Sequence, residues 1–190
     1  GIPPALELAA ARVRTLSLDA MDSDGERYRL LETVRQYARE RLAASGDADD
    51  TRTRHLAYYL ALGEAADPKM LGDEEETWHA RLDADRENLL AAIGNAASLP
   101  ATAQEGLRFV HSVRMWLRRL SMDLAYRFVT EALARDGAQG RNLVRADALG
   151  TAASFCYFQG RYDNARRLAE GASRSRGNEA IRCVPPTGSR

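Results

Sequence analysis

Apolar residues recur at the three- and four-residue spacing of amphipathic helices along almost the whole chain. Only the short stretch 28–31 has the character of a strand. We therefore predict an all-α protein in which antiparallel helical hairpins stack against one another. The predicted helices cover residues 3–17, 33–44, 51–67, 73–97, 102–118, 122–135, 142–158 and 161–175.

Residues with special backbone preferences mark where these helices begin and end. Pro3 suits a first helical turn, and Gly46 is typical of a residue that follows a helix C-terminus. Asp73 is the predicted N-cap of a helix whose first turn is acidic, because carboxylates favour the positive end of the helix dipole. Residues 177–190 contain a Pro-Pro pair and two glycines, and we expect a disordered tail there.

The last four helices contain an internal repeat in which matched positions lie 40 residues apart. The second copy resembles a tetratricopeptide repeat, because its glycine, tyrosine and alanines stand at that repeat's positions. The first copy has leucine in place of the turn glycine, so an ordinary pair of antiparallel hairpins stays open as the alternative. The residues predicted to pack the hairpins are Leu120, Ala125 and Ala132 in the first copy, and Gly160, Tyr162, Ala165 and Ala172 in the second.

The charges of the chain are balanced, since 27 basic side chains face 27 acidic ones. Such a balance gives no long-range attraction to nucleic acid or anionic lipid. Cys156 and Cys183 match no metal or redox spacing, and Cys156 falls in an apolar helical pattern where a buried thiol is expected. No apolar run approaches the roughly 20 residues that cross a bilayer, so we expect a cytoplasmic protein without a membrane partner.

We find no motif for catalysis in the sequence. ATP hydrolysis needs a glycine-rich loop before a lysine that reaches the phosphates, whereas Lys69 follows Asp-Pro without such a loop. His55, His79 and His111 are far apart in the sequence and are predicted to be surface or helix-face histidines. No Gly-x-Ser-x-Gly elbow exposes a nucleophile. We therefore expect no enzymatic activity, no metal site and no cofactor.

Two groups of arginines are candidates for contacts with DNA phosphates. The first, between residues 27 and 41, is interleaved with glutamates, a pattern that favours a solvated helix with internal ion pairs. The second surrounds Trp116, where a buried aromatic face and solvated arginines are the favoured interpretation: Arg114, Arg118 and Arg119. We do not expect this chain alone to bind nucleic acid.

Four segments resemble one family of bacterial regulators: Gly1–Val13, Tyr28–Leu42, Arg54–Leu60 and Leu82–Leu90. The second is similar to the last strand and helix of that family's winged-helix domain. The family is that of the signal-transduction ATPases with numerous domains, which includes AfsR-like and LuxR-like transcriptional regulators. The resemblance implies that Pro3 lies beside the adenine of a bound nucleotide, a contact that we expect to be vestigial here.

The sequence also departs from that family. It has no phosphate-binding loop, and only ten residues separate Leu16 from Arg27, where most of the winged-helix domain would lie. We therefore expect a truncated member of the family. Its predicted parts are a nucleotide-binding and winged-helix remnant (1–45), a helical linker region (46–100), tetratricopeptide-like repeats (101–176) and the tail (177–190).

A non-catalytic interaction module is the function that these expectations favour. Stacked hairpins form a right-handed array with a concave surface that can hold a protein or peptide partner. An apolar end face on the last hairpin is also expected, and it would promote self-association. Two alternatives stay open: a fragment of a DNA-associated transcriptional regulator, and a protein with residual ATP binding.

Overall fold

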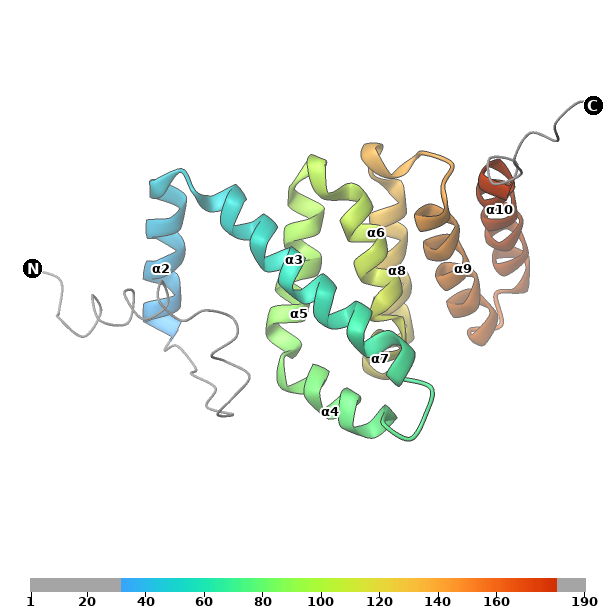
Figure 1. The fold of residues 1–190 in the computed structure, drawn as a ribbon, viewed down its shortest axis with the longest axis horizontal. Coiled ribbons are helices and arrows are strands. Elements are labelled where there is room, and N and C mark those ends of the chain that lie inside the picture. The colour runs from blue at the N-terminus through green and yellow to red at the C-terminus, as the bar shows by residue number, and fades with distance from the viewer. Residues whose placement is uncertain (1–31, 181–190) are drawn as a thin grey trace, which may run out of the picture. The chain divides into compact units, whose positions relative to one another are not determined.

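The computed structural model describes residues 32–180, and every regular element within them is helical (Figure 1). The chain divides into two compact units, residues 1–48 and 49–190. In the first unit the structure describes helix α2 (Glu32–Ser45). The residue after it, Gly46, has a φ of 80°, which confirms the predicted helix end. Pro3, the predicted first helix and the predicted strand lie outside the described residues.

The second unit is built from a run of helices joined by short connections. They are α3 (Ala48–Ala66), α4 (Glu75–Ala84), α5 (Arg86–Ser98), α6 (Ala103–Ser112), α7 (Arg114–Leu120), α8 (Met122–Ala134), α9 (Leu143–Phe158) and α10 (Tyr162–Ala180). Short 3₁₀ turns lie at Asp67–Lys69, Pro100–Thr102 and Asp136–Ala138. The predicted all-α class is confirmed, while the stacking of hairpins as tetratricopeptide-like repeats stays a prediction.

Two of the predicted helices are each broken into two. The breaks fall at Asp85, between α4 and α5, and at Val113, between α6 and α7. At both residues the backbone leaves the helical region, with φ near −100° and ψ near 15°. The apolar positions on both sides of each break still face the core, as the burial of Leu82 and Leu89 shows. A kink that preserves the burial of both halves is not visible in periodicity alone.

Two predicted helix ends were wrong. Helix α4 begins at Glu75, and the residue before it is Glu74 rather than Asp73. The Glu74 carboxylate makes no cap hydrogen bond there, but it accepts a hydrogen bond of 2.6 Å from Lys69 Nζ. Helix α10 continues to Ala180, past the predicted start of the tail at Gly177, because one glycine weakens a helix without ending it. The rest of the tail lies outside the described residues.

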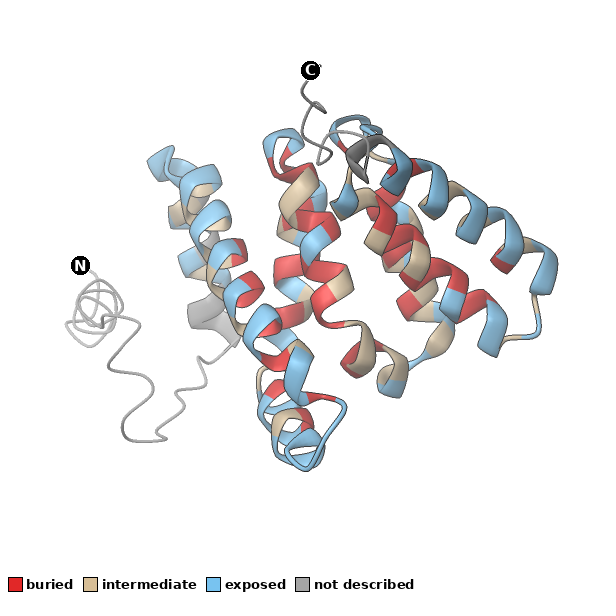
Figure 2. Cartoon of the chain, turned by 45° about the vertical axis from the view of Figure 1, so that its right-hand side comes forward, coloured by how far each residue is buried: buried red, intermediate tan, exposed pale blue. Residues whose placement is uncertain are grey.

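The core of the second unit lies between the facing sides of its helices (Figure 2). Its largest fully buried side chains are Trp116, Phe109, Leu56, Met70, Leu82, Leu89, Leu107 and Leu117. Helix α9 adds mostly small residues to this core, among them Ala148, Ala152 and Cys156. The buried thiol of Cys156 confirms the prediction for that residue, and Cys183 lies outside the described residues.

Polar contacts connect helices that are distant in the sequence. The buried Trp116 donates its indole N–H to Asp83 Oδ1 at 2.9 Å, which ties α7 to α4. Arg108 on α6 pairs with Glu64 on α3 at 2.5 Å. Helix α3 comes especially close at Gly63, where an added Cβ would lie 2.5 Å from Ser112 Oγ and 2.9 Å from Val113 Cγ1. Glycine is therefore required at this crossing for steric reasons.

We predict that Gly63→Ala destabilises the fold, because a methyl group at this crossing overlaps the side chains of Ser112 and Val113. The expected loss is about 1–3 kcal/mol of unfolding free energy, measured by urea denaturation followed by circular dichroism. The matched control is Gly94→Ala, since Gly94 also lies within a helix but an added Cβ there meets nothing within 4 Å. That control is expected to gain up to about 1 kcal/mol from helix propensity. Equal stability of the two variants would contradict the close approach.

Candidate functional site

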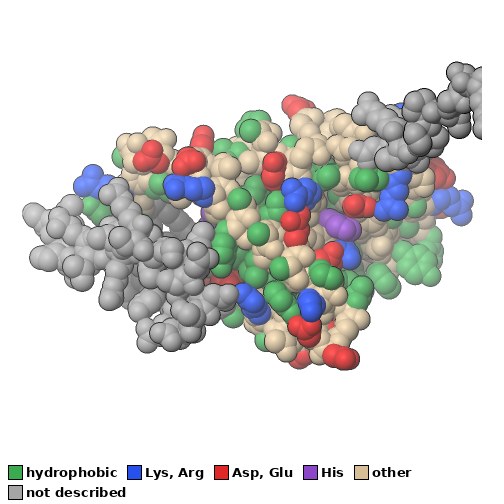
Figure 3. All heavy atoms as spheres, viewed as in Figure 1, with side chains coloured by type: hydrophobic (Ala, Val, Ile, Leu, Met, Phe, Trp, Pro, Cys, Tyr) green, Lys and Arg blue, Asp and Glu red, His purple; other side chains and the backbone are tan. Residues whose placement is uncertain are grey.

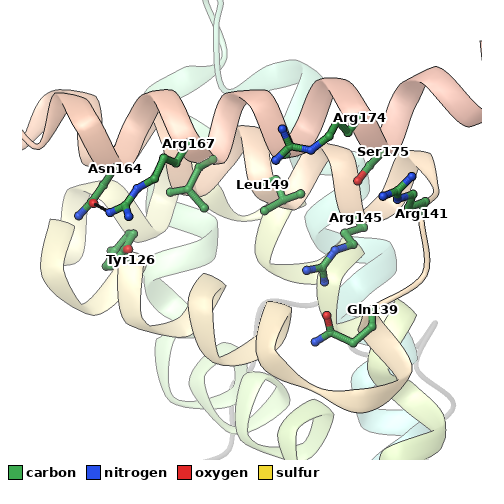
Figure 4. A pocket seen from close by; sticks show the side chains of 11 residues that line it. Tyr126, Gln139, Arg141, Arg145, Leu149, Asn164, Arg167, Arg174 and Ser175 are labelled. Carbon is green, nitrogen blue, oxygen red and sulfur yellow. Dashed lines mark hydrogen bonds between the residues drawn. The ribbon is translucent and has the colours of Figure 1, made fainter.

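A groove of about 620 Å³ lies on the second unit where α10 passes α9 and α8 (Figure 4). We call it the arginine groove. Its lining residues are Tyr126 from α8, Gln139 and Arg141 from the connection to α9, Arg145 and Leu149 from α9, and Asn164, Arg167, Leu168, Gly171, Arg174 and Ser175 from α10.

Arginines outnumber carboxylates in the lining of the arginine groove. Its lining contains four arginines and no aspartate or glutamate. Outside the lining, Glu170 pairs with Arg174 at 3.9 Å on the exposed surface of α10. Elsewhere in residues 32–180, arginines commonly have a closer carboxylate partner, as in the pairs Arg52–Asp49, Arg108–Glu64, Arg114–Asp67, Arg119–Glu76 and Arg176–Asp147. The groove lining is therefore a local region rich in positive charge on a chain with no net charge.

Arg145 lines the groove and also stabilises the local fold. Its guanidinium donates hydrogen bonds to the carbonyl oxygens of Leu133 at 3.0 Å and Ala138 at 2.6 Å. These bonds hold the connection between α8 and α9 against the start of α9. Burial lowers the pKa of Arg145 from its usual value, but an arginine stays protonated in proteins. The residue thus keeps a charge at the floor of the groove.

The opposite end of the groove is formed by Tyr126, Asn164 and Arg167 (Figure 4). Arg167 donates a hydrogen bond to Asn164 Oδ1, which orients its guanidinium along α10. Burial, followed by a hydrogen bond with the Cys156 thiol, raises the pKa of Tyr126. The Arg161 guanidinium lies 4.2 Å from the centre of the Tyr126 ring, so a further cation stands beside this end.

The predicted packing residues fall into three groups of burial. Ala125, Ala132 and Ala165 are buried, and Leu120 and Ala172 are partly buried against the core. Gly160 and Tyr162 are exposed. The alanines thus lie inside the hairpins, but whether the matched positions mark a tetratricopeptide repeat stays a prediction.

Gly160 and Tyr162 do not pack as the sequence suggested. Gly160 has a φ of 74°, and an added Cβ would meet nothing within 4 Å. Glycine is therefore favoured at this position because the turn between α9 and α10 needs a left-handed backbone conformation, and not because two helices approach closely there. The Tyr162 side chain is 62% exposed, and its ring stacks edge-on against Tyr157 with centroids 5.6 Å apart.

The predicted apolar end face of the last hairpin is not present on α10. The exposed positions of this helix are mainly charged or polar: Asp163, Arg166, Arg167, Glu170, Ser173 and Arg174. The exposed aromatic rings gather instead at the turn before it, at Tyr157, Phe158 and Tyr162. Self-association stays a prediction, but α10 does not present the apolar face that was expected to promote it.

The arginines around Trp116 are not simply solvated. Trp116 is buried as predicted, but Arg114 pairs with Asp67 at 2.5 Å and Arg119 with Glu76 at 3.1 Å. Arg118 lies over the Phe158 ring, 5.4 Å from its centre. These arginines therefore hold neighbouring elements together. Of the other group, Arg41 contacts Tyr37 on α2, and Arg27 and Arg29 lie outside the described residues.

Acidic and basic side chains lie beside one another over the face that Figure 3 displays. None of the helices between residues 32 and 180 combines the length and apolar character needed to span a bilayer. Within the same residues, no group of three or more histidine, cysteine, aspartate or glutamate side chains is placed to hold a metal ion.

The three histidines, predicted as surface or helix-face residues, all lie on helices but are buried to different extents. His79 is buried, while His55 and His111 are half-buried. His55 shares a hydrogen bond with Asn95 at 3.3 Å, and His111 shares one with Thr151 at 2.9 Å. The partners of His55 and His111 come from other helices, 40 residues away in the sequence, so the spacing of residues along the chain did not predict them.

The groove arginines were not predicted from the sequence. The only signal was their spacing, because Arg141 and Arg145 are four residues apart and Arg167 and Arg174 are seven apart. The second spacing places two side chains on one face of α10, whereas Arg141 precedes the first residue of α9. The absence of carboxylates from the groove lining depends on how α8, α9 and α10 pack. Spacing along the sequence therefore could not distinguish these four arginines from the other 22 arginines of the chain.

Comparison with known proteins relates part of the chain to mycobacterial regulators. One protein from Mycobacterium bovis and two from Mycobacterium tuberculosis strains (CDC 1551 and H37Rv) are 46% identical to the chain over 66 residues. Each is named as an HTH-type transcriptional regulator. The alignment covers 35% of this chain but only 7% of each relative. No family model matches the chain, and no solved structure matches it. The chain is thus similar to a small part of much longer transcriptional regulators.

We predict that Arg145→Met destabilises the fold while Arg141→Met does not. The first change removes a donor to the carbonyl oxygen of Ala138 and one of two side-chain donors to that of Leu133, and an unsatisfied buried acceptor costs about 1–3 kcal/mol. Arg141 is exposed, so its change is expected to stay within about 0.5 kcal/mol of the wild type. Urea denaturation of both variants checks this, and similar midpoints would rule out the structural role of Arg145.

We also predict that the fold loses stability between pH 7.5 and pH 5.5. Burial lowers the pKa of His55, His79 and His111, and the nearby Arg119 and Arg114 further lower the pKa of His79 and His111 respectively. Since the unfolded chain keeps a histidine pKa of about 6.5, it binds protons first as the pH falls. The stability is therefore complete above that pKa and declines below it.

Thermal melts at the two pH values measure this effect. The variant His111→Gln, which keeps a polar partner for Thr151, should show a smaller shift of the melting temperature than the wild type. A melting temperature that is the same at both pH values would contradict the prediction.

Proposed function

We propose that the chain is a non-catalytic recognition module of a transcriptional regulator, and that it binds an acidic protein or peptide segment in the arginine groove. The unopposed charge of the groove carries this proposal, since four arginines and no carboxylate line it. The similarity to the mycobacterial regulators supports the regulatory context. A guanidinium can hold a carboxylate through two parallel hydrogen bonds, which favours acidic side chains as ligands.

The side chains of the groove favour binding over acid–base chemistry. Arginine stays protonated in proteins, and the raised pKa of Tyr126 keeps its hydroxyl neutral at physiological pH. The remaining polar groups of the lining are the amides of Gln139 and Asn164 and the hydroxyl of Ser175. None of these exchanges a proton near pH 7, so the groove is suited to hold a ligand unchanged.

The position of the arginines favours a slender protein segment over duplex DNA. They line a hollow between helices, whereas readers of duplex DNA insert a protruding helix or strand into a groove of the duplex. Elsewhere on the second unit, carboxylates commonly accompany the arginines, as in Arg108–Glu64 and Arg119–Glu76. Such pairs weaken attraction to a phosphate backbone.

Binding of a fluorescent acidic peptide tests this proposal, with anisotropy as the measurement. We predict that Arg167→Gln weakens binding about tenfold, since a charge-assisted hydrogen bond contributes about 1.5 kcal/mol. The matched control is Arg166→Gln, because Arg166 is the exposed neighbour on the same helix and does not line the groove. This control should bind like the wild type, and added salt should weaken binding of both.

The same titration with duplex DNA and with ATP addresses the alternative functions. We expect neither to displace the peptide at equal concentration. Tighter binding of the duplex, with a steep dependence on salt, would replace the proposal by a DNA-binding function. Equal losses in the Arg166 and Arg167 variants would show that binding does not occur in the groove.

A further inference from the structure

Exposed aromatic side chains gather at the turn between α9 and α10. Tyr157, Phe158 and Tyr162 are 61%, 60% and 62% exposed, and their rings adjoin one another. Hydrophobic side chains stand out over this turn at the right-hand edge of the face in Figure 3. We call the three rings the aromatic patch. A contiguous exposed apolar surface of this kind is typical of an interaction site.

The aromatic patch stands on a turn that backbone hydrogen bonds close. The Gly160 N–H donates to the Tyr157 carbonyl oxygen at 3.0 Å, and the Arg161 N–H donates to that of Cys156 at 2.9 Å. With the positive φ of Gly160, these bonds form a C-cap that fixes the end of α9. Since Tyr162 then begins α10, a ligand binds the rings without the cost of ordering a loop.

The three rings present a ridged surface rather than a flat one. The Tyr157 ring plane is inclined by 77° to that of Phe158 and by 66° to that of Tyr162. A polyproline II segment suits such a surface, because its side chains project from an extended backbone and dock among aromatic rings. Its carbonyl oxygens have no internal hydrogen bonds, so they can accept from the tyrosine hydroxyls.

The surroundings of the aromatic patch favour an uncharged ligand. The Arg118 guanidinium lies over the Phe158 ring, 5.4 Å from its centre, so a cationic ligand is repelled there. The exposed Asp123 carboxylate accepts a hydrogen bond of 2.7 Å from Gln159 in the turn. This acidic group beside the patch disfavours a phosphate backbone. An apolar segment meets neither obstacle.

The area of the aromatic patch suits a short segment. An aromatic side chain can bury about 150–250 Å², so three rings that are each about 60% exposed leave roughly 270–450 Å² for a ligand. A specific interface between two folded proteins covers about 800 Å² on each partner. The patch is therefore too small for a folded partner by itself, but a few apolar residues of an extended chain cover it.

We infer that the aromatic patch binds Val184, Pro185 and Pro186 of a second copy of this chain. These residues follow α10 and lie outside the described residues. Two adjacent prolines favour the polyproline II conformation, which reduces the entropy lost on binding. The other proline pair of the chain, Pro3-Pro4, is followed by a helical pattern and suits a first helical turn. The inference does not depend on the arginine groove.

The length of chain after α10 assigns the segment to a second copy. Helix α10 runs for 19 residues from Tyr162 to Ala180, which is about 28 Å. The residues from Ala180 to Pro185 span at most about 18 Å when fully extended. The prolines of one copy therefore do not return to its own Tyr162. Each copy has a patch at one end of α10 and a proline segment beyond the other, which joins copies head to tail.

A fluorescent peptide with the sequence of residues 181–190 tests this inference by anisotropy in reducing buffer. Its receptor is the full chain carrying Pro185→Ala and Pro186→Ala, whose own segment does not compete. We expect Tyr162→Ala in the receptor to weaken binding at least about tenfold, as for an aromatic residue central to an interface. A peptide with alanine at both prolines should bind equally weakly. The matched control is Leu143→Ala, an exposed hydrophobic residue at the other end of α9, which should bind like the parent.

Sedimentation velocity of the full chain provides an independent measurement. We expect assemblies that grow with concentration, but only monomers for Tyr162→Ala and for the double variant Pro185→Ala, Pro186→Ala. A mixture of these two variants should form a heterodimer and nothing larger, because one intact patch meets one intact segment. Melting curves show whether each variant keeps its fold.

This inference and the proposed function can fail separately. Undiminished peptide binding by Tyr162→Ala, or by the peptide without prolines, would overturn the inference, as would an unaltered chain that stays monomeric at high concentration. Arg167→Gln weakens acidic peptides under the proposed function but should leave binding of the 181–190 peptide unchanged. A heterodimer from the two mixed variants, together with loss of peptide binding in Tyr162→Ala, supports the inference.

Discussion

Helix α9 is buried on nearly every side, and this burial holds the second unit and its groove together. The helix presents buried residues around most of its circumference, including Ala146, Leu149, Thr151, Phe155 and Cys156. Neighbours in α6, α8 and α10 supply the surfaces that cover them. Because most of these side chains are small, the neighbouring helices can approach closely. The groove forms where α10 passes α9, beside Arg145 and Leu149.

The charges of the second unit separate into two kinds. Many arginines join helices through carboxylates, as Arg108 does with Glu64 and Arg114 with Asp67. Exposed pairs of this kind contribute little to stability, about 1 kcal/mol or less each, but they neutralise the surface. The groove arginines lack such partners among its lining residues. The chain has a net charge of zero, yet the groove lining carries a local excess of positive charge. This excess distinguishes the groove from the paired charges described above.

The regulatory context and the binding chemistry come from different observations. The mycobacterial relatives share one stretch of 66 residues with this chain, a small part of their own length. Their names connect that stretch with transcriptional regulators, while the proposed binding chemistry rests on the arginines of the groove. A helical module that holds an acidic segment can change its partner contacts when that segment is displaced, since a ligand shifts an equilibrium by its differential affinity for two states.

The sequence by itself determined the helical class and most helix positions. Apolar periodicity and breakers such as Gly46 and Pro100 act within a few residues, so the local chain encodes them. It also predicted the burial of Cys156, which follows from its place in an apolar helical pattern. Only the tertiary structure decided the kinks at Asp85 and Val113, the burial of His79 and the unopposed arginines of the groove. Each of these depends on which side chains a neighbouring helix supplies, and that is decided by the packing of helices that are distant in the sequence.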